Sequence, residues 1–415
     1  MSARIPGLTA TGQRRVFVNI LILTAVAATG LLLLYPRLAG AALWRATITP
    51  LASIIGSGFL VLGPILDASY GLYAPLVMAL LCLGAALFGM AIRFNIATLA
   101  GKGNRRGRLE ERLDLAASWS LAFAYIISVA YYLNLFGAFG VSLTAVNDAL
   151  HAKLLTSAIF ILILAVGWGY GFRVLEGLEQ ISVSIKLAII AGLVAGLALF
   201  FAGKAAGGTL VFNPPTVTGW SAVTLAFGLI VTVQGFETSR YLGATYDAGM
   251  QIRSMLWAQG LSSAIYMVYI GLIAYLFSRG ELKLSETAII DMMAYVAPIL
   301  PALLVAAALS AQFSAAVADT SGSGGLVEEL THRRVKARGG YALLVGTGLL
   351  LTWTTDIFAI IAYASRAFAL YYALQSAIAA ASAARLPGRR PLAVLFAGLA
   401  VLGALIVVFG TPVEG

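Results

Sequence analysis

The chain has 415 residues, of which 60% are hydrophobic and only 11% are charged. Soluble domains carry about 25% charged residues, so this composition indicates an integral membrane protein and excludes disordered, fibrous, nucleic-acid-binding and disulfide-rich secreted classes. The net charge of +10 lies in short loops beside apolar segments, which indicates bilayer sidedness rather than nucleic acid as a partner. One cysteine excludes an internal disulfide, and two histidines argue against a metal site.

Apolar segments follow one another along the chain, each long enough for a spanning helix of about 20 residues. We expect helices because backbone groups in hydrocarbon must be satisfied within each segment, and the alternating polarity of a β-barrel is missing. The sequence therefore predicts an all-α polytopic membrane protein. Its predicted spans are 16–36, 44–66, 71–98, 113–141, 154–172, 178–202, 219–240, 254–278, 287–319, 340–355, 357–383 and 391–410. Spans 44–66 to 357–383 are called segments 1 to 10.

Lysine and arginine are shared unevenly between alternate loops, which predicts the orientation of the chain. The basic loops 101–112, 332–338 and 385–390 fall on one side, so we expect them to be cytoplasmic in a cell (inner) membrane. Segment 16–36 lacks a small-residue cleavage site and is expected to remain in the protein. If this segment crosses the bilayer, Arg14 and Arg15 lie outside the cell, which conflicts with the charge rule. The segment could instead be re-entrant or lie at the periphery of the membrane.

Two spans are interrupted by glycine. Segment 1 contains Ile55-Gly56-Ser57-Gly58-Phe59, and segment 6 contains Gln234-Gly235-Phe236-Glu237-Thr238. The loops after segments 2 and 7 follow at a similar offset but differ in basic charge, which indicates two five-helix halves of opposite orientation. Chance pairing among frequent glycines is the alternative. The predicted divisions are 1–43 (one extra helix), 44–202 (first repeat), 203–384 (second repeat) and 385–415 (C-terminal helix).

A broken helix leaves backbone N–H and C=O groups free near the middle of the bilayer, where they must line a cavity or bind something. The N-terminal end of a half-helix suits a carboxylate, and freed carbonyls suit a cation or an ammonium group. We therefore expect a small-molecule site between the two breaks. Its predicted residues are Ile55, Gly56, Ser57, Gly58, Gln234, Gly235, Phe236 and Glu237.

These sequences resemble motifs of the amino acid-polyamine-organocation (APC) superfamily. Ile55-Gly56-Ser57-Gly58-Phe59-Leu60 resembles its first-helix motif, Gln234-Gly235-Phe236-Glu237 its sixth-helix motif, and Ser184-Ile185-Lys186-Leu187 the lysine segment of its proton-coupled members. The resemblance covers roughly residues 44–410. It implies a LeuT-type fold with a five-plus-five inverted repeat and secondary transport of amino acids, amines or related solutes. It also implies that the Lys186 ammonium lies against carbonyls of segment 1.

Ionisable groups inside a membrane are costly, so each is a functional candidate. Glu237 could receive an amine or exchange a proton, or it could simply fasten the break in segment 6. Lys186 could exchange a proton during transport, or its head could reach the headgroups. Ser310 and Ser314, one turn apart, could hold sodium with carbonyls of segment 1, or they could only pack helices. Proton and sodium coupling therefore compete.

Segment 3 is rich in polar and aromatic residues. Tyr125 and Tyr132 belong to one face that could line the pocket, although aromatic packing is the alternative. Phe236, Trp119, Tyr363 and Phe368 are candidate gates. Arg366 in segment 10 requires a partner that the sequence does not name.

The sequence favours a secondary transporter working by alternating access, proton-coupled, for an amino acid or amine. A sodium-coupled or passive transporter or channel for another solute or an inorganic ion is the alternative. A membrane-embedded enzyme is disfavoured because no catalytic cluster is evident, and no ATP-binding P-loop sequence occurs. The expected partners are a small-molecule substrate and the lipid bilayer, with no cofactor other than a transported proton or sodium ion. Oligomeric state stays open.

Overall fold

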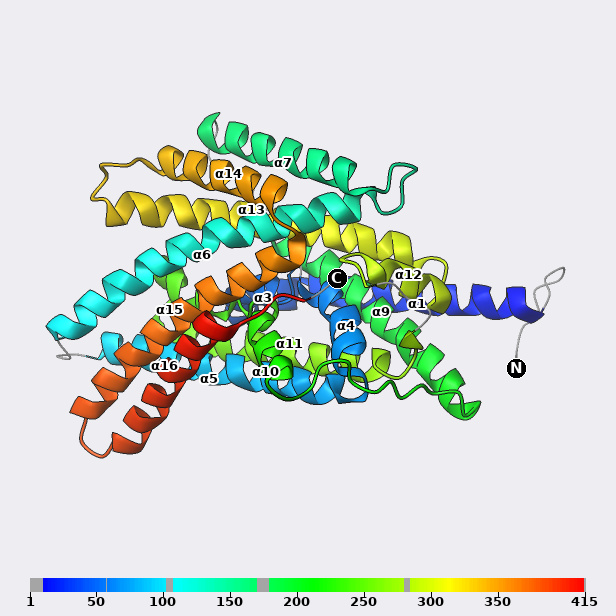
Figure 1. The fold of residues 1–415 in the computed structure, drawn as a ribbon, viewed down its shortest axis with the longest axis horizontal. Helices are drawn as coiled ribbons and strands as arrows, with labels where there is room; N and C mark the ends of the chain where they lie inside the picture. The colour runs from blue at the N-terminus through cyan, green and yellow to red at the C-terminus, as the bar shows by residue number, and fades with distance from the viewer. Residues whose placement is uncertain (1–9, 57, 102–106, 170–178, 280–283, 414–415) are drawn as a thin grey trace.

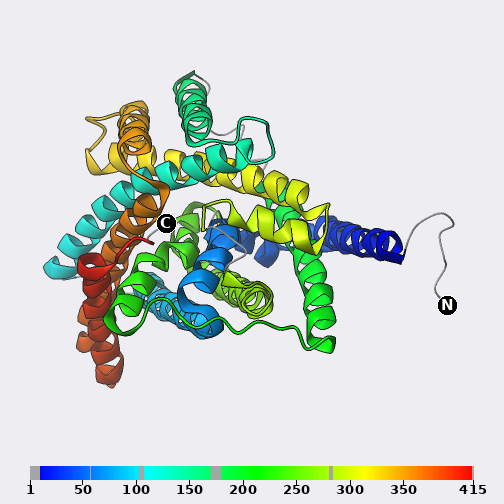
Figure 2. The same ribbon diagram turned by 45° about the vertical axis from the view of Figure 1, so that its right-hand side comes forward.

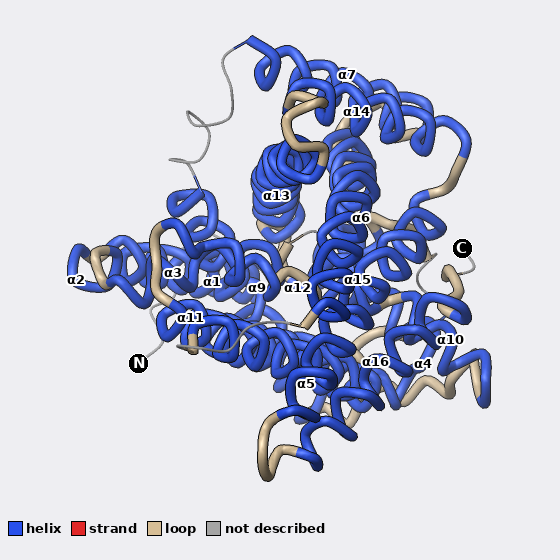
Figure 3. Tube along the Cα trace, turned by 90° about the vertical axis from the view of Figure 1, so that its left-hand side faces the viewer, coloured by secondary structure: helices blue, strands red, loops and turns tan. Residues whose placement is uncertain are grey.

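The computed structural model describes residues 10–56, 58–101, 107–169, 179–279 and 284–413. Within these ranges the regular structure is helical, without a β-strand, which confirms the all-α prediction (Figures 1 and 3). The elements are α1 (Ala10–Leu34), α2 (Pro36–Ala39), α3 (Ala42–Ile54), α4 (Gly58–Tyr70), η1 (Gly71–Tyr73), α5 (Ala74–Ala100), α6 (Arg108–Val141), α7 (Ala149–Gly169), α9 (Glu179–Ala206), α10 (Gly219–Gly228), η2 (Ile230–Val233), η3 (Phe236–Ala244), α11 (Ala248–Ile273), α12 (Ala288–Val296), α13 (Leu300–Leu330), α14 (Ala337–Thr354), α15 (Ile357–Arg385) and α16 (Arg390–Phe409).

Nine helices in the described part of the chain are long and apolar enough to cross a membrane. This agrees with the predicted multi-pass architecture. The spans missing from these nine include the short α14 and the broken segment 6, whose pieces are each too short to cross alone.

Two predicted boundaries are wrong. Segment 8, predicted as one helix over 287–319, is divided into α12 and α13, because Pro298 disfavours helical backbone at Ala297, which is extended (φ −158°, ψ 138°). Residues 108–112 belong to α6 rather than to a loop 101–112, since the Glu110 carboxylate accepts a hydrogen bond from Gly107 N (2.5 Å) and caps the new helix.

Helix α1 packs along α9 through small residues. A Cβ atom on Gly192 would lie 2.6 Å from Val26 Cγ2, so the two helices approach closely at this point. In Figure 1 the N-terminal end of α1 points to the right, whereas α13 meets α14, and α15 meets α16, on the left. Segment 16–36 is therefore a full-length helix alongside the bundle, with its N-terminal end opposite these two basic connections.

Helix α16 packs on α15 in a comparable way. A Cβ atom on Gly403 would lie 2.8 Å from Ala373 Cβ. Beyond α16, the chain folds back over α10, where Thr411 N donates to Thr224 O (2.9 Å). Arg366 finds its partner here, because its Nε donates to Gly410 O at 2.9 Å.

The two broken segments meet at the centre of the bundle (Figure 2). In segment 1, α3 ends at Ile54 and α4 begins at Gly58. In segment 6, α10 gives way to η2, an extended Gln234, and Gly235 with φ 114° before η3. A Cβ on Gly235 would lie 2.4 Å from Ser53 Cβ, so both the positive φ and the contact with α3 require glycine.

Replacing Gly192 with leucine should separate α1 from α9. The larger side chain would overlap Val26 and Ile22, and overpacking of this kind costs about 1–3 kcal/mol of stability. We expect a lower melting temperature in detergent. Gly346→Leu is the control because a Cβ there meets nothing within 4 Å; equal melting temperatures for the two variants would contradict this packing.

Candidate functional site

Side chains from neighbouring helices satisfy the backbone groups that the breaks set free. The Tyr266 hydroxyl of α11 lies 3.1 Å from Ile54 O and 2.6 Å from Thr232 O, so it can donate to a carbonyl of either break. Ser365 of α15 donates to Gly228 O (2.6 Å) and accepts from Val231 N (3.1 Å). The breaks are thus built into the packing of the bundle.

Lys186 of α9 is buried, with 4% of its surface exposed, and its Nζ donates to Ala52 O at the end of α3 (2.9 Å). The resemblance to the APC superfamily implied this contact between the Lys186 ammonium and a carbonyl of segment 1. One turn earlier on α9, the Ser182 hydroxyl lies 2.6 Å from the Ser310 hydroxyl of α13. Ser314 is half-buried one turn farther along α13. The structure therefore brings Lys186, the end of α3 and Ser310 into one region.

Glu237 lies in the first turn of η3 and is fully buried. Its Oε2 atom accepts hydrogen bonds from Gly235 N (3.0 Å) and from the Tyr372 hydroxyl (2.9 Å). Its Oε1 atom is also buried and has no hydrogen-bond partner among the described residues. One carboxylate oxygen fastens the break, while the other has no partner in the part of the chain that the structure describes.

A second carboxylate, Asp319, lies in the middle of α13 and is buried. It accepts a hydrogen bond from the Ser128 hydroxyl of α6 and lies within electrostatic range of Glu237. The predicted site did not include Asp319, which stood at the predicted end of segment 8, residue 319. The helix in fact continues to Leu330, which places Asp319 deep in the bundle.

Aromatic rings surround the two carboxylates. Tyr372 is stacked between Phe236 (5.1 Å between ring centroids) and Phe88 (5.2 Å). Tyr125, predicted for the site, meets Phe368 edge-on at 6.2 Å. The Tyr132 hydroxyl accepts from Gln234 Nε2 at 2.9 Å. Tyr372 was missed because it is one of several aromatic residues in segment 10, and nothing local marks it as the partner of Glu237.

Two buried acceptors at this centre lack partners among the described residues. Gln234 Oε1 and Glu237 Oε1 are both buried without a hydrogen bond from the part of the chain that the structure describes. A buried acceptor left unpaired is costly, so the arrangement suits a ligand that donates hydrogen bonds and carries positive charge. Tyrosine and phenylalanine rings nearby add favourable faces for a cation.

The remaining predicted site residues and candidate gates that the structure describes fall into two groups, one buried at the centre and one exposed on the surface. Ile55 is fully buried at the break, and Gly56 precedes Ser57, which lies outside the described residues. A Cβ on Gly58 would lie 2.9 Å from Thr232 Cα, so this glycine lets α4 approach η2 rather than a solute. Of the candidate gates, Phe236 and Phe368 are buried in the centre, whereas Trp119 and Tyr363 are more than 40% exposed on the outer surface.

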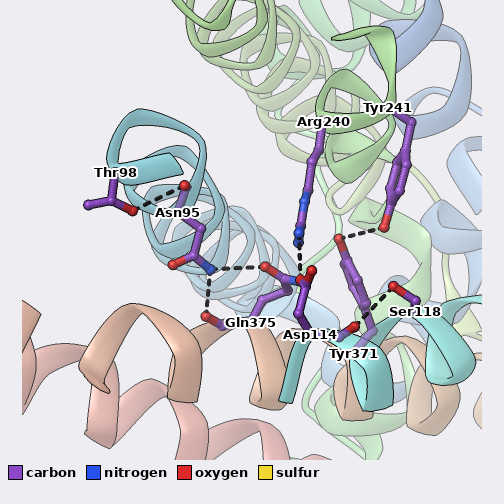
Figure 4. Close-up of polar contacts among 8 residues, drawn as sticks. All are labelled: Asn95, Thr98, Asp114, Ser118, Arg240, Tyr241, Tyr371 and Gln375. Carbon is purple, nitrogen blue, oxygen red and sulfur yellow. Dashed lines mark hydrogen bonds and ion pairs between the residues drawn. The ribbon is translucent and has the colours of Figure 1, made fainter. Parts of the chain in front are cut away.

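Polar contacts connect η3 with α6 and α15 near the end of the bundle where α6 begins (Figure 4). Arg240 of η3 pairs with Asp114 of α6 at 2.6 Å, and the hydroxyls of Tyr241 and Tyr371 lie 3.3 Å apart. Residues three apart share a face of a 3₁₀ helix, so Arg240 lies one turn after Glu237 on the same face of η3. The ion pair therefore links the broken segment 6 to segment 3.

Comparison with known proteins gives two findings. A family model described as an APC superfamily transporter matches residues 36–410, which leaves α1 before the matched range. A curated relative from Aquifex aeolicus (strain VF5), described only as an uncharacterized protein, is 39% identical over 361 residues, covering 84% of this chain and 86% of the relative.

Removing the Tyr372 hydroxyl should destabilise the centre while leaving the ring stack in place. Tyr372→Phe takes one donor from the buried Glu237 carboxylate, and such a loss costs about 1–3 kcal/mol. We expect a lower melting temperature for Tyr372→Phe than for Tyr275→Phe, whose hydroxyl donates to Leu72 O at 3.3 Å just beyond the C-terminal end of α11. A Tyr372→Phe protein as stable as the wild type would mean that this hydrogen bond does not hold Glu237.

Proposed function

Since the chain belongs to the APC superfamily of transporters, we propose that it is a proton-coupled secondary transporter that moves a small organic amine across the cell membrane by alternating access. The observation that carries this proposal is the buried centre, where Glu237 and Asp319 face a set of aromatic rings beside two broken helices.

An amine is favoured by the charges of the centre. Two carboxylates, Glu237 and Asp319, lie within electrostatic range of each other, and an ammonium group between them would relieve their repulsion. It would also supply donors to Glu237 Oε1 and Gln234 Oε1, the two buried acceptors without partners in the described chain. A methylene chain on the solute would contact Phe236 and Tyr372.

An amino acid is the second candidate solute. It is favoured by the N-terminal end of α4 at Gly58, which presents helix-dipole charge and backbone N–H groups suited to a carboxylate. Its amino group would still bind at Glu237. The two candidates differ in what Asp319 does, because a second carboxylate in the site opposes a zwitterion more than a simple cation.

Proton coupling is favoured over sodium coupling by the position of Lys186. Its ammonium group occupies the space beside Ala52 O, at the carbonyl end of α3, which a sodium ion would need. Ser310, a candidate sodium ligand, is paired with Ser182. A lysine in a desolvated place can release its proton and take it up again as the site opens and closes.

Alternating access would move segments 1, 2, 6 and 7 against segments 3, 4, 8 and 9. These groups follow from the predicted repeats 44–202 and 203–384. The Arg240–Asp114 pair joins segment 6 to segment 3 on the side of the basic connections, which the charge rule assigns to the cytoplasm of the cell membrane. We infer that this pair closes the inner pathway and breaks when the solute is released.

Uptake into proteoliposomes should separate the two carboxylates from ordinary acidic residues. We expect Glu237→Gln and Asp319→Asn each to reduce uptake of radiolabelled small amines at least tenfold, because about 1.4 kcal/mol of lost charge interaction already has that effect on binding. Asp148→Asn, an exposed carboxylate between α6 and α7, is the control. Uptake of amino acids but not amines would support the second candidate, and uptake of neither would overturn the assignment to amines and amino acids.

Replacing Lys186 with glutamine should separate coupling from folding. Glutamine keeps a donor for Ala52 O but cannot exchange a proton, so we expect loss of uptake driven by a pH gradient while exchange of labelled solute across equilibrated membranes continues. Lys153→Ala, at the start of α7, is the control. Full pH-driven uptake by Lys186→Gln would remove Lys186 from coupling, stimulation by sodium would favour the sodium alternative, and indifference of the wild type to both gradients would favour a passive facilitator.

A further inference from the structure

A deep apolar groove lies on the side of the bundle between α5, α10 and α16. Its volume is about 470 Å³. Aliphatic and aromatic side chains make up nearly all of its wall, and no charged side chain lines it among the described residues. It is separate from the carboxylate centre, and the transport mechanism above does not use it.

The groove runs along α5. On α5 its wall follows one face through Val77, Leu81, Gly84 and Phe88, one residue per turn. At a rise of 1.5 Å per residue, this face is roughly 16 Å long from Val77 to Phe88. Half of the hydrocarbon core of a bilayer is about 15 Å thick, so the groove matches an extended hydrocarbon chain of one leaflet.

The mouth of the groove is continuous with the lipid-facing surface. Leu80 and Val223 at its rim are 58% and 40% exposed, whereas Leu81, Phe88 and Ile230 at its floor are at most 5% exposed. Helix α16 forms one wall of the groove. It has the highest mean hydropathy (2.9) of the helices that could span a membrane, and most of its surface is not covered by protein. Hydrocarbon, rather than water, is therefore the medium that fills the groove.

The two ends of the groove differ in polarity. Tyr70, Tyr73 and Thr218 lie at the end where α5 begins, and the Tyr70 hydroxyl donates to Ala222 O (2.6 Å). Tyrosines at this level are typical of the membrane interface. The opposite end is closed by Phe88 and Ile230. A molecule with an apolar tail and a polar end fits this gradient, whereas a uniformly apolar or charged molecule does not.

From these observations we propose that the groove binds one acyl chain of a membrane phospholipid. The absence of charged lining residues in the described chain means that the acyl chain, rather than a particular headgroup, is recognised. The tip of the chain reaches Phe88 and Ile230.

The closed end of the groove is the back wall of the carboxylate centre. Phe88 stacks on Tyr372 with 23° between the rings, and Tyr372 donates to Glu237. Ile230 belongs to η2, within the break of segment 6. A bound acyl chain thus supports the rings that hold Glu237, and an empty groove leaves them unsupported.

A photoactivatable phospholipid tests the proposal. The protein is reconstituted in vesicles of phosphatidylethanolamine and phosphatidylglycerol containing phosphatidylcholine with a diazirine near the end of one acyl chain, and the crosslinked residues are mapped by mass spectrometry. We expect labelling concentrated on the groove floor, at Leu81, Phe88 and Ile230. Labelling spread evenly over the exposed faces of α5, α11 and α16 would overturn the proposal.

Two matched glycine variants make the test specific. A Cβ on Gly84 meets only Ile230 Cδ1, at 3.9 Å, so Gly84→Phe fills the groove without displacing backbone. Gly260→Phe on α11 adds the same ring to a face where nothing lies within 4 Å. Labelling of the floor should be lost in Gly84→Phe and kept in Gly260→Phe; equal labelling in both would contradict the proposal. Labelling by a diazirine fatty acid but not by the phospholipid would also overturn it, since the occupant would then be a free amphiphile.

Discussion

Peptide groups that leave a helix inside a membrane must find partners within the protein, and this requirement organises the whole centre of the molecule. The breaks at Ile55–Gly56 and at Gln234–Gly235 could not persist in hydrocarbon by themselves. Tyr266, Ser365 and Lys186 provide the missing hydrogen bonds from three different helices. Because each partner comes from far away in the sequence, the breaks and the bundle depend on each other.

The same requirement for partners within the protein explains why the site is rich in acceptors. Glu237 uses one oxygen to hold the turn at Gly235 and leaves the other unpaired in the described structure. Asp319 approaches from the opposite helix, held by Ser128. Two acids whose surroundings are tyrosine and phenylalanine form a negatively charged centre, and the proposed amine substrate rests on this charge.

Much of the fold could be predicted from the sequence because its signals are local. Long apolar runs gave the helices, and the glycines of segments 1 and 6 marked both breaks. The contact between Lys186 and segment 1 followed from resemblance to proton-coupled transporters. What failed depended on less visible features: Pro298 divided segment 8, and the true end of α13 beyond residue 319 moved Asp319 from the presumed membrane edge to the interior.

The partners of the site residues could not be predicted in this way. Tyr266 caps Ile54 across more than two hundred positions, and Tyr372 differs from its neighbour Tyr371 only in the direction of its side chain. Such roles are decided by which helices become neighbours. A single sequence records the residue types but not those pairings.

The two helices outside the predicted five-helix repeats also have a mechanical consequence. Helix α1 covers the back of α9, the fifth helix of the first predicted half, and α16 covers the back of α15, the fifth helix of the second. Helices α9 and α15 thus each form an antiparallel pair with an outer helix, and a packed pair of helices bends less than a single helix. Lys186 on α9 and the tyrosines on α15 therefore lie on stiffened helices. The broken segments can tilt against these helices while the positions of Lys186 and the tyrosines stay fixed.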